Sequence, residues 1–205
     1  MISGIPVYGL TGNMGMGKST VADNFRTYRD VFVIDADIVN REVLRDPANK
    51  DELALLFGPT IFTAAGIDTK ALAHIVFNDQ AALHKLEQFN HPKIWARICA
   101  AIAKHSGSIA FAVVEETLLY ETYHANAFDG VIVVSCLEAE QYRRLQTSRG
   151  LTKEEIGRRL ARQTPIIDKL QRADFIVSTD YPPSAVTENV QRIYEFLKSK
   201  NKPTV

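Results

Sequence analysis

The chain has 205 residues, of which 46% are hydrophobic and 23% charged, values that are typical of one compact globular domain. Its 24 basic and 24 acidic residues leave a net charge of zero, which argues against general binding to nucleic acid or to a membrane surface. Two cysteines are too few for a disulfide framework or a zinc site, and no signal peptide or membrane-spanning run is visible, so we expect a cytoplasmic protein.

Short runs rich in valine and isoleucine alternate along the chain with segments of helical period. Apolar runs of this kind are typical of strands covered on both faces, and helices between them predict parallel pairing. A first helix is expected over residues 18–28, directly after a glycine-rich turn. We therefore predict an α/β fold in three layers, with a five-stranded parallel sheet between helices. The expected strands are residues 5–10, 31–35, 109–114, 131–136 and 175–177.

A long segment, about residues 38–107, separates the second and third strands and has an almost wholly helical pattern. Pro92 lacks the N–H that the first turn of a helix leaves unpaired, so we expect a helix to begin there, with Trp95 in its buried stripe. A helical insertion of this size is suited to building a second binding surface. We expect a single domain over residues 1–205, with the insertion at about residues 60–106.

The turn after the first strand carries a phosphate-binding motif. Residues 12–19 match G-x-x-x-x-G-K-[ST] at every fixed position, between a predicted strand and a predicted helix. Glycines let backbone N–H groups point at phosphate oxygens, and the helix N-terminus adds partial positive charge. Lys18 is then placed to neutralise the β- and γ-phosphates, and the Ser19 hydroxyl to bind Mg²⁺, which predicts a nucleoside triphosphate as the ligand. The predicted nucleotide-binding residues are Gly12, Asn13, Met14, Gly15, Met16, Gly17, Lys18, Ser19 and Thr20, with the two methionine side chains expected to pack.

Missing patterns exclude several kinds of P-loop protein. The D-x-x-G and N-K-x-D patterns of GTPases are absent, since residues 49–51 fall one residue short of the second. ATPases of motors and transporters are usually larger and carry a hydrophobic run that ends in Asp-Glu. A small-molecule kinase fits better because it needs only the loop, an acid, an acceptor pocket and a basic lid.

Two carboxylates, Asp35 and Asp37, lie at the carboxyl end of the second predicted strand. Ligands bind at this edge of an open α/β sheet. Asp37 is placed to take the proton of an acceptor hydroxyl, as the catalytic aspartate of a kinase does, and the alternative is a cap on the helix that follows. For Asp35 a functional role and a plain strand end stay equally open.

A strongly basic segment follows the fourth predicted strand. From Arg143 to Arg172 there are nine basic residues and three acidic ones, a net charge of +6. We expect a helical lid at about residues 138–168, whose arginines pair with phosphate oxygens while its closure excludes water. The alternative is a pair of solvated helices with ion pairs at the i,i+4 spacing of Glu154–Arg158 and Glu155–Arg159. Three arginines that have no such acidic partner favour the lid: Arg144, Arg149 and Arg162.

The sequence resembles one known family, the dephospho-CoA kinases, along nearly its whole length. The P-loop alone is generic, whereas Asp-Ala-Asp followed by an arginine, His-Pro and Leu-Leu-Tyr-Glu form a much more specific combination. The segments that carry the resemblance are residues 9–12, 17–22, 33–37 with Arg41, 57–58, 76–77, 91–92, 118–121 and 173–176.

The resemblance implies an activity and a set of roles. In that family ATP phosphorylates the 3′-hydroxyl of the dephospho-CoA ribose, with Mg²⁺ as the cofactor. Carried over by position, Asp37 is the general base, Lys18 the phosphate clamp, and the helical insertion the platform for the acceptor. The implied acceptor contacts are Arg41, His91, Leu118 and Leu119, although His91 also fits an ordinary residue at a helix start. The implied lid residues are Arg144, Arg149 and Arg159.

The sequence departs from the family pattern at three places. Residues 115–117 are Glu-Glu-Thr, where the family commonly has Asp-x-Pro, so Glu115 is a candidate carboxylate near Mg²⁺, acting through water, or simply a polar strand end. Lys70 stands in place of the usual arginine, and residues 178–180 replace an asparagine-rich stretch. The rival functions are a kinase for a nucleoside, a nucleotide or shikimate, and a nucleotide-dependent switch with no acceptor.

Overall fold

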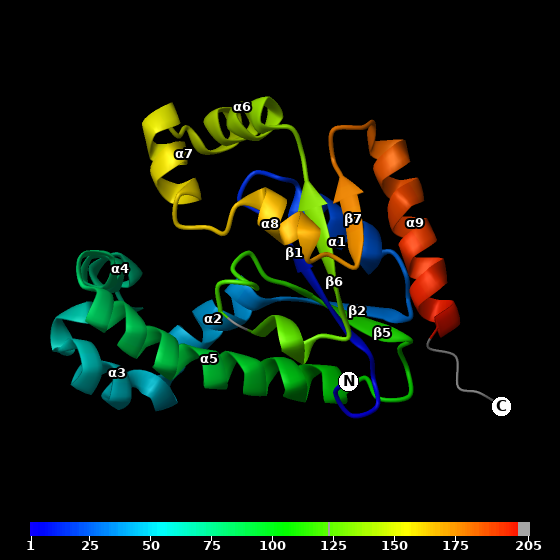
Figure 1. Ribbon diagram of the computed structural model, residues 1–205. Coiled ribbons are helices and arrows are strands. Elements are labelled where there is room, and N and C mark those ends of the chain that lie inside the picture. The colour runs from blue at the N-terminus through cyan, green and yellow to red at the C-terminus, as the bar shows by residue number, and fades with distance from the viewer. Residues whose placement is uncertain (123, 201–205) are drawn as a thin grey trace. The chain divides into compact units, whose positions relative to one another are not determined.

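The computed structural model describes residues 1–122 and 124–200. The chain divides into two compact units: Met1–Asp35 with Ile102–Val205, and Ala36–Ala101. The first unit contains a five-stranded sheet and the second is mainly helical (Figure 1).

The sheet of the first unit is wholly parallel, as predicted. Its strands lie in the order β2-β5-β1-β6-β7, so the strand that leads into the phosphate-binding motif is the central one. Every residue of β1 and β5 is buried, which explains their unbroken apolar sequences. The strands are β1 (Val7–Thr11), β2 (Val31–Asp35), β5 (Phe111–Glu115), β6 (Gly130–Ser135) and β7 (Phe175–Ser178).

Helices cover both faces of this sheet and complete the predicted three layers. On one face, α1 and α9 pack over alternate residues of β6, Ile132 and Val134. On the other face, α8 contributes Ile166 and Leu170 to a cluster that includes Val131. The helices α6 and α7 follow β6 beyond the carboxyl ends of the strands (Figure 1). The bounds of these helices are α1 (Lys18–Arg26), α6 (Glu138–Arg149), α7 (Lys153–Leu160), α8 (Ile166–Gln171) and α9 (Pro183–Lys200), with a 3₁₀ turn, η3, at His124–Ala127.

The second unit begins directly after β2, at Ala36, and therefore holds two helices ahead of the segment that we expected from about residue 60. Its buried apolar side chains come from successive helices and include Leu53, Leu72 and Phe89. A short antiparallel pair, β3 (Phe62–Thr63) with β4 (Gly66–Ile67), interrupts the helices. The helical elements are α2 (Ala36–Arg45), η1 (Pro47–Asn49), α3 (Lys50–Phe57), η2 (Pro59–Ile61), α4 (Thr69–Asn78) and α5 (Gln80–Ala103), whose last two residues belong to the first unit.

The expectation that a helix begins at Pro92 is wrong, because α5 runs through this residue without a break. A proline inside a helix removes one backbone hydrogen bond and costs about 3 kcal/mol. The side chains of Phe89 and Ile98, on either side of it in the same helix, are almost completely buried. Burial of such side chains stabilises by about 1.5–3 kcal/mol each, which is enough to offset the proline.

The two cysteines, Cys99 and Cys136, are unpaired and partly buried. Burial raises the pKa of both thiols, that of Cys136 to about 11, so both are protonated near neutral pH and unreactive. Within the part of the chain that the structure describes, no helix has the length and apolar character needed to cross a membrane.

Candidate active site

The phosphate-binding motif forms the loop between β1 and α1. Gly12, Gly15 and Gly17 all have positive φ angles, of 148°, 81° and 84°. A Cβ atom on Gly12 would lie 2.3 Å from the carbonyl oxygen of Val134, so this position has no room for a side chain. The sequence therefore forms a tight loop that ends at the N-terminus of α1, as the motif requires.

The side chain of Lys18 turns back over this loop. It is buried, and its Nζ donates to the carbonyl oxygens of Gly12, at 2.8 Å, and Asn13, at 3.4 Å. Ser19 and Thr20, which follow in the first turn of α1, are exposed. The loop thus presents an ammonium group and hydroxyl groups at one edge of the sheet, where a bound phosphate would meet them.

The methionine side chains of the loop pack, as expected. Met14 joins a buried cluster with Leu145 of α6 and Ile156 of α7. Met16 is 2% exposed, and its carbonyl oxygen accepts a hydrogen bond from Thr179 Oγ1 at 2.9 Å. The loop is therefore held by α6 and α7 at Met14 and by the residue that follows β7 at Met16.

Two carboxylates meet at this edge, because Asp35 and Glu115 are paired residues of β2 and β5. Ser19 Oγ donates to Glu115 Oε1 at 3.2 Å. Burial and, next, the charge of Asp35 raise the pKa of Glu115. Attraction by Lys18 and Arg26 and the hydrogen bond from Ser19 act in the opposite direction.

The oxygens of Ser19 and Glu115 fit the chemistry of Mg²⁺, which prefers hard oxygen ligands. Among the described residues, no group of three or more His, Cys, Asp or Glu side chains is placed to hold a metal ion. Mg²⁺ usually keeps several waters and takes its other ligands from one or two protein oxygens and from substrate phosphates, so the two oxygens of Ser19 and Glu115 suffice for it.

Replacing Glu115 with glutamine is expected to raise the melting temperature near neutral pH and to lower Mg²⁺-dependent turnover by about ten- to a hundredfold. The pKa of this carboxyl group is higher in the folded protein than in the unfolded chain. Its contribution to stability is therefore present below the unfolded pKa and is lost as the pH rises through the folded pKa. Glutamine stays neutral and keeps an oxygen that accepts from Ser19. Melting curves measured without Mg²⁺ between about pH 4 and 8 test this.

The matched control is Glu116→Gln, one residue further along, where the carboxylate accepts from Thr122 Oγ1 at 3.2 Å. Glu116→Gln should leave the melting temperature with the same dependence on pH as in the wild-type protein. A lower melting temperature for Glu115→Gln near neutral pH, with the wild-type pH dependence, would contradict the prediction.

Asp37 and Arg41 lie in α2, the first helix of the second unit. Asp37 is the second residue of α2 and Arg41 follows one turn later, so the two share a face of the helix, and both side chains are exposed. His91 lies inside α5, which begins eleven residues earlier at Gln80, so the alternative of a helix-start residue is wrong. Its side chain is partly buried.

The two leucines that we expected to contact an acceptor lie next to each other in the turn after β5 but differ in exposure. Leu118 is 43% exposed, whereas Leu119 is fully buried in a cluster with Val131 and Val133. A Cβ atom on Gly9 would lie 2.3 Å from Leu119 Cδ1, so this leucine fills space over the central strand. The side chain of Leu119 therefore belongs to the core, and the expected acceptor contact of this turn stays a prediction.

Arg144 of the expected lid is anchored beside the phosphate-binding loop. Its Nη1 and Nη2 donate to Thr179 Oγ1 and to the Thr179 carbonyl oxygen, at 2.8 and 2.7 Å. Its Nε donates to Glu140 at 2.7 Å, so the expectation that Arg144 lacks an acidic partner is wrong: the partner lies one turn earlier, just outside the basic segment. Hydrogen bonds from Arg143 and Arg144 lower the pKa of Glu140 to about 2.

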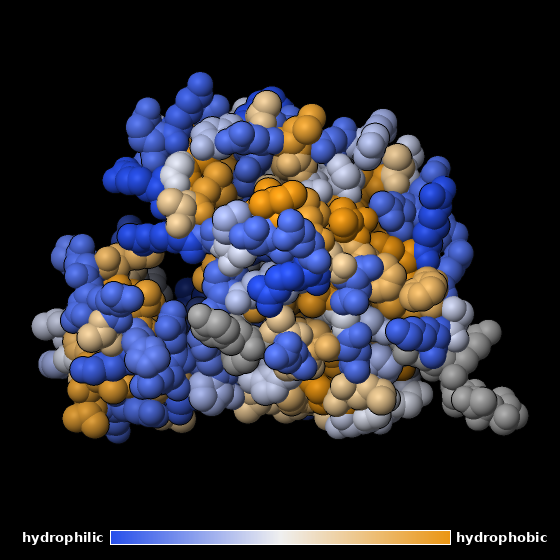
Figure 2. Space-filling view, viewed as in Figure 1, coloured by the Kyte–Doolittle hydropathy of each residue, from blue (hydrophilic) through white to orange (hydrophobic). Residues whose placement is uncertain are grey.

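The two other lid arginines are exposed. Arg149 is the last residue of α6, and Arg159 lies in the last turn of α7. Glu155, which the alternative of solvated helices pairs with Arg159, accepts from the backbone N–H of Thr152 at 2.8 Å in a capping box. The surface over α6 and α7 is mostly hydrophilic (Figure 2).

Several polar residues around the loop carry no signal in the sequence. Thr179, in the stretch that departs from the family pattern, holds both Arg144 and the loop carbonyl of Met16. Gln141 donates to the Met14 carbonyl oxygen, and Gln163 accepts from the Met14 N–H. Lys169 is a completely buried cation. Their partners are distant in sequence, and no spacing rule connects them.

The strand order, the glycine loop and the lysine above it define the class, a P-loop protein with the three-layer fold of small kinases. A model of the family described as dephospho-CoA kinase matches residues 6–182. The chain belongs to this family.

Similar proteins agree with this assignment. Dephospho-CoA kinases of Bdellovibrio bacteriovorus and Aquifex aeolicus are 36% and 34% identical, over 93% and 92% of this chain and 95% and 96% of their own. The solved structure of TT1252 from Thermus thermophilus matches with a TM-score of 0.84 and 27% identity, over 94% of this chain and 97% of that one. Dephospho-CoA kinase from Campylobacter jejuni matches with a TM-score of 0.72 and 28% identity, over 95% and 98%.

Proposed function

We propose that this protein transfers the γ-phosphoryl group of ATP to the 3′-hydroxyl of the dephospho-CoA ribose, giving coenzyme A and ADP. The observation that carries the proposal is the family match over residues 6–182, on a chain whose central strand leads into a fully formed phosphate-binding loop. The relatives named as dephospho-CoA kinases support the choice of acceptor.

Residues of the loop bind and orient the triphosphate in this proposal. The backbone N–H groups of the glycine-rich loop and the N-terminus of α1 bind phosphate oxygens. Lys18, held over the loop by Gly12 and Asn13, exchanges carbonyl partners for phosphate oxygens when the nucleotide binds. Its charge stabilises the negative charge that spreads over the transferred group.

Ser19 and Glu115 would hold Mg²⁺, Ser19 directly and Glu115 through water. The ion, when bound, neutralises charge on the β- and γ-phosphates. The chain's own contribution is a buried carboxylate at the end of β5, aligned with Asp35 of β2 and fixed by a hydrogen bond from Ser19.

Asp37 is proposed to orient the acceptor hydroxyl and to take its proton. One residue separates it from β2, it lies in the first turn of α2, and its side chain is exposed. Arg41, His91 and the turn of Leu118 and Leu119 are proposed to contact the acceptor, as the resemblance implies.

The exposed arginines of α6 and α7, Arg149 and Arg159, are proposed to close over the phosphates as a lid. Arg144 has a different place in this proposal. Because Thr179 and Glu140 already hold its guanidinium beside Gly17, it forms a fixed wall of the nucleotide site.

The decisive assay follows ADP release from MgATP in parallel with dephospho-CoA, nucleosides, nucleoside monophosphates, shikimate and no acceptor. We expect a rate with dephospho-CoA alone, and a product that is heavier than the acceptor by one phosphoryl group. A rate that appears only with another acceptor would overturn the substrate. A rate that is the same without any acceptor would overturn the kinase function and favour a nucleotide-dependent switch.

A further inference from the structure

Lys169 is a buried cation that the proposed reaction does not use. Its side chain is fully buried in α8, in the first unit. Nζ donates to the carbonyl oxygen of Thr117 at 3.0 Å and pairs with Glu121 Oε1 at 3.0 Å. Burial lowers the pKa of Lys169, and the hydrogen bond and charge of Glu121 oppose this shift. An apolar side chain would avoid this desolvation, so the ion pair needs another explanation.

The partner, Glu121, joins the turn after β5 to the segment that leaves α7. The same oxygen that pairs with Lys169, Oε1, accepts from the backbone N–H of Thr164 at 2.7 Å. Residues 163–164 lie between the end of α7 and the start of α8, and we call them the lid root. One partly buried carboxylate thus holds the backbone of the lid root.

The lid root in turn holds the apex of the phosphate-binding loop. Asn13 Nδ2 donates to the Thr164 carbonyl oxygen at 3.3 Å, and the Met14 N–H donates to Gln163 Oε1 at 3.1 Å. Gln141 of α6 donates to the Met14 carbonyl oxygen at 2.7 Å. Asn13 and Met14 therefore depend on the lid root for their position.

A second set of hydrogen bonds connects Lys169 to the residue before Gly12. Thr11 Oγ1 donates at 3.2 Å to the Thr117 carbonyl oxygen, the atom that also accepts from Lys169. The residues before and after Gly12 are thus both tied, by different routes, to one ion pair. Gly12 is the residue whose carbonyl oxygen holds Lys18.

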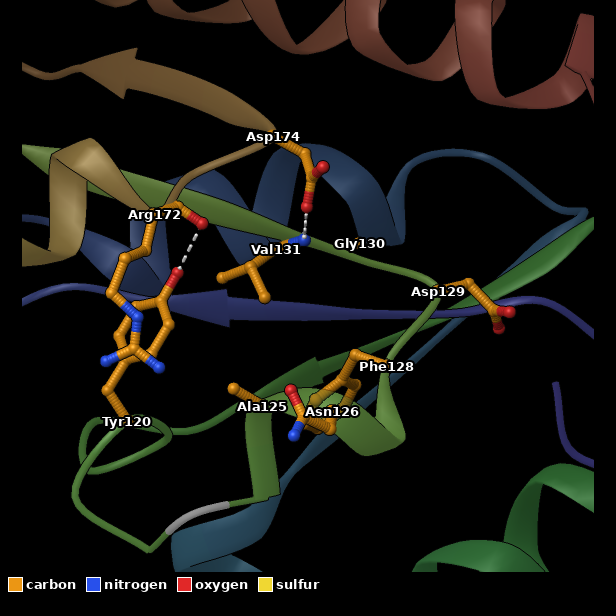
Figure 3. A pocket seen from close by; sticks show the side chains of 9 residues that line it. All are labelled: Tyr120, Ala125, Asn126, Phe128, Asp129, Gly130, Val131, Arg172 and Asp174. Carbon is orange, nitrogen blue, oxygen red and sulfur yellow. Dashed lines mark hydrogen bonds between the residues drawn. The ribbon is translucent and has the colours of Figure 1, made fainter.

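The residue at the C-terminal end of α8 also contacts the turn after β5. Tyr120 OH donates to the Arg172 carbonyl oxygen at 2.9 Å, and the Arg172 guanidinium lies 4.1 Å from the Tyr120 ring centroid. Figure 3 shows both contacts at the wall of a cavity of about 340 Å³. The turn after β5 therefore contacts both Lys169 within α8 and Arg172 at its end.

We infer that Glu121 and Lys169 are positioning residues for the nucleotide: through the lid root they set the geometry of the phosphate-binding loop. This inference rests on the proposed function only for the binding of ATP, not for the identity of the acceptor. Loop geometry matters because small displacements of a binding group weaken contacts to a charged ligand strongly.

The test measures equilibrium binding of a non-hydrolysable MgATP analogue. Glu121→Ala and Lys169→Met should each weaken binding by about tenfold. Gln163→Ala, which removes the partner of the Met14 N–H from a half-buried position, should have a similar effect. Because part of the effect of Glu121 passes through Gln163, the double variant Glu121→Ala with Gln163→Ala should lose less affinity than the two single effects multiplied together. Glu121→Gln keeps an acceptor for Thr164 and should restore most of the affinity.

Leu197→Ala is the control for a loss of stability alone, because Leu197 is buried in α9 against the sheet. It should lower the melting temperature and leave the affinity unchanged. Affinities within about twofold of wild type for Glu121→Ala and Lys169→Met would overturn the inference, and so would multiplied effects in the double variant. If those two variants fail to fold, normal affinity of Gln163→Ala overturns it alone. Wild-type binding without phosphorylation of dephospho-CoA would instead refute the proposed function.

Discussion

Replacing Lys18 with alanine is expected to lower kcat/KM by about a thousandfold and to weaken ATP binding. The Lys18 side chain is buried and its Nζ is held at 2.8 Å from the Gly12 carbonyl oxygen, so its charge acts at short range on a phosphate bound by the loop. It interacts with the phosphates both before and during transfer, so both KM for ATP and kcat should change. Steady-state kinetics with varied ATP, together with direct binding of the nucleotide, measure the two effects.

Lys198→Ala is the control, because it removes another lysine that lies in a helix. The partner of Lys198 is Asp30, with Nζ and Oδ2 2.7 Å apart. Lys198→Ala should leave both constants near wild type. Lys18→Arg should recover little activity, since the larger planar guanidinium does not fit where one Nζ contacts two loop carbonyl oxygens. Unchanged ATP affinity and rate in Lys18→Ala would contradict the assignment of the loop.

Local signals in the sequence were sufficient for the sheet and the phosphate-binding loop. The buried runs of β1 and β5 have no polar residue until the edge where ligands bind, and the motif of residues 12–19 has the same meaning wherever a strand precedes it. Predicted strands matched observed ones within about two residues for the same reason, since each is bounded by polar or turn residues.

Predictions failed where packing between distant residues decides the outcome. Pro92 indicated a helix start, yet burial of Phe89 and Ile98 carries α5 through it. The motif that contains Leu119 likewise gave no sign that its side chain lies over Gly9 in the core. Neither residue's surroundings can be deduced from its neighbours in sequence.

The electrostatics of the site were the least predictable part. The excess of basic residues after β6 is visible in the sequence, but which arginine is anchored and which is exposed depends on Thr179, thirty-five residues away from Arg144. Likewise Lys169 and Glu121 are forty-eight residues apart. Charge counts therefore located the segment without identifying the partners.

Replacing Asp37 with asparagine is expected to lower kcat by about 10²- to 10⁴-fold with little change in ATP affinity. Asparagine has the same shape and can still accept a hydrogen bond from the acceptor hydroxyl, but it cannot take the proton. Asp37 lies in α2, outside the loop that binds phosphate, so nucleotide binding should survive. Single-turnover rates at saturating ATP and acceptor isolate this step, and direct nucleotide binding provides the second measurement.

Asp35→Asn is the informative comparison, because it makes the same change two residues earlier, at the end of β2. Asp35 lies beside Glu115 on the adjacent strand, and its charge raises the pKa of the Glu115 carboxyl group. Loss of the Asp35 charge should therefore alter the Mg²⁺ requirement more than the chemical step. A larger loss of kcat in Asp35→Asn than in Asp37→Asn would assign the base to the strand end. Near-normal turnover in Asp37→Asn would remove Asp37 from the base role. The roles of the two carboxylates are thus distinguished by the constant that each substitution changes.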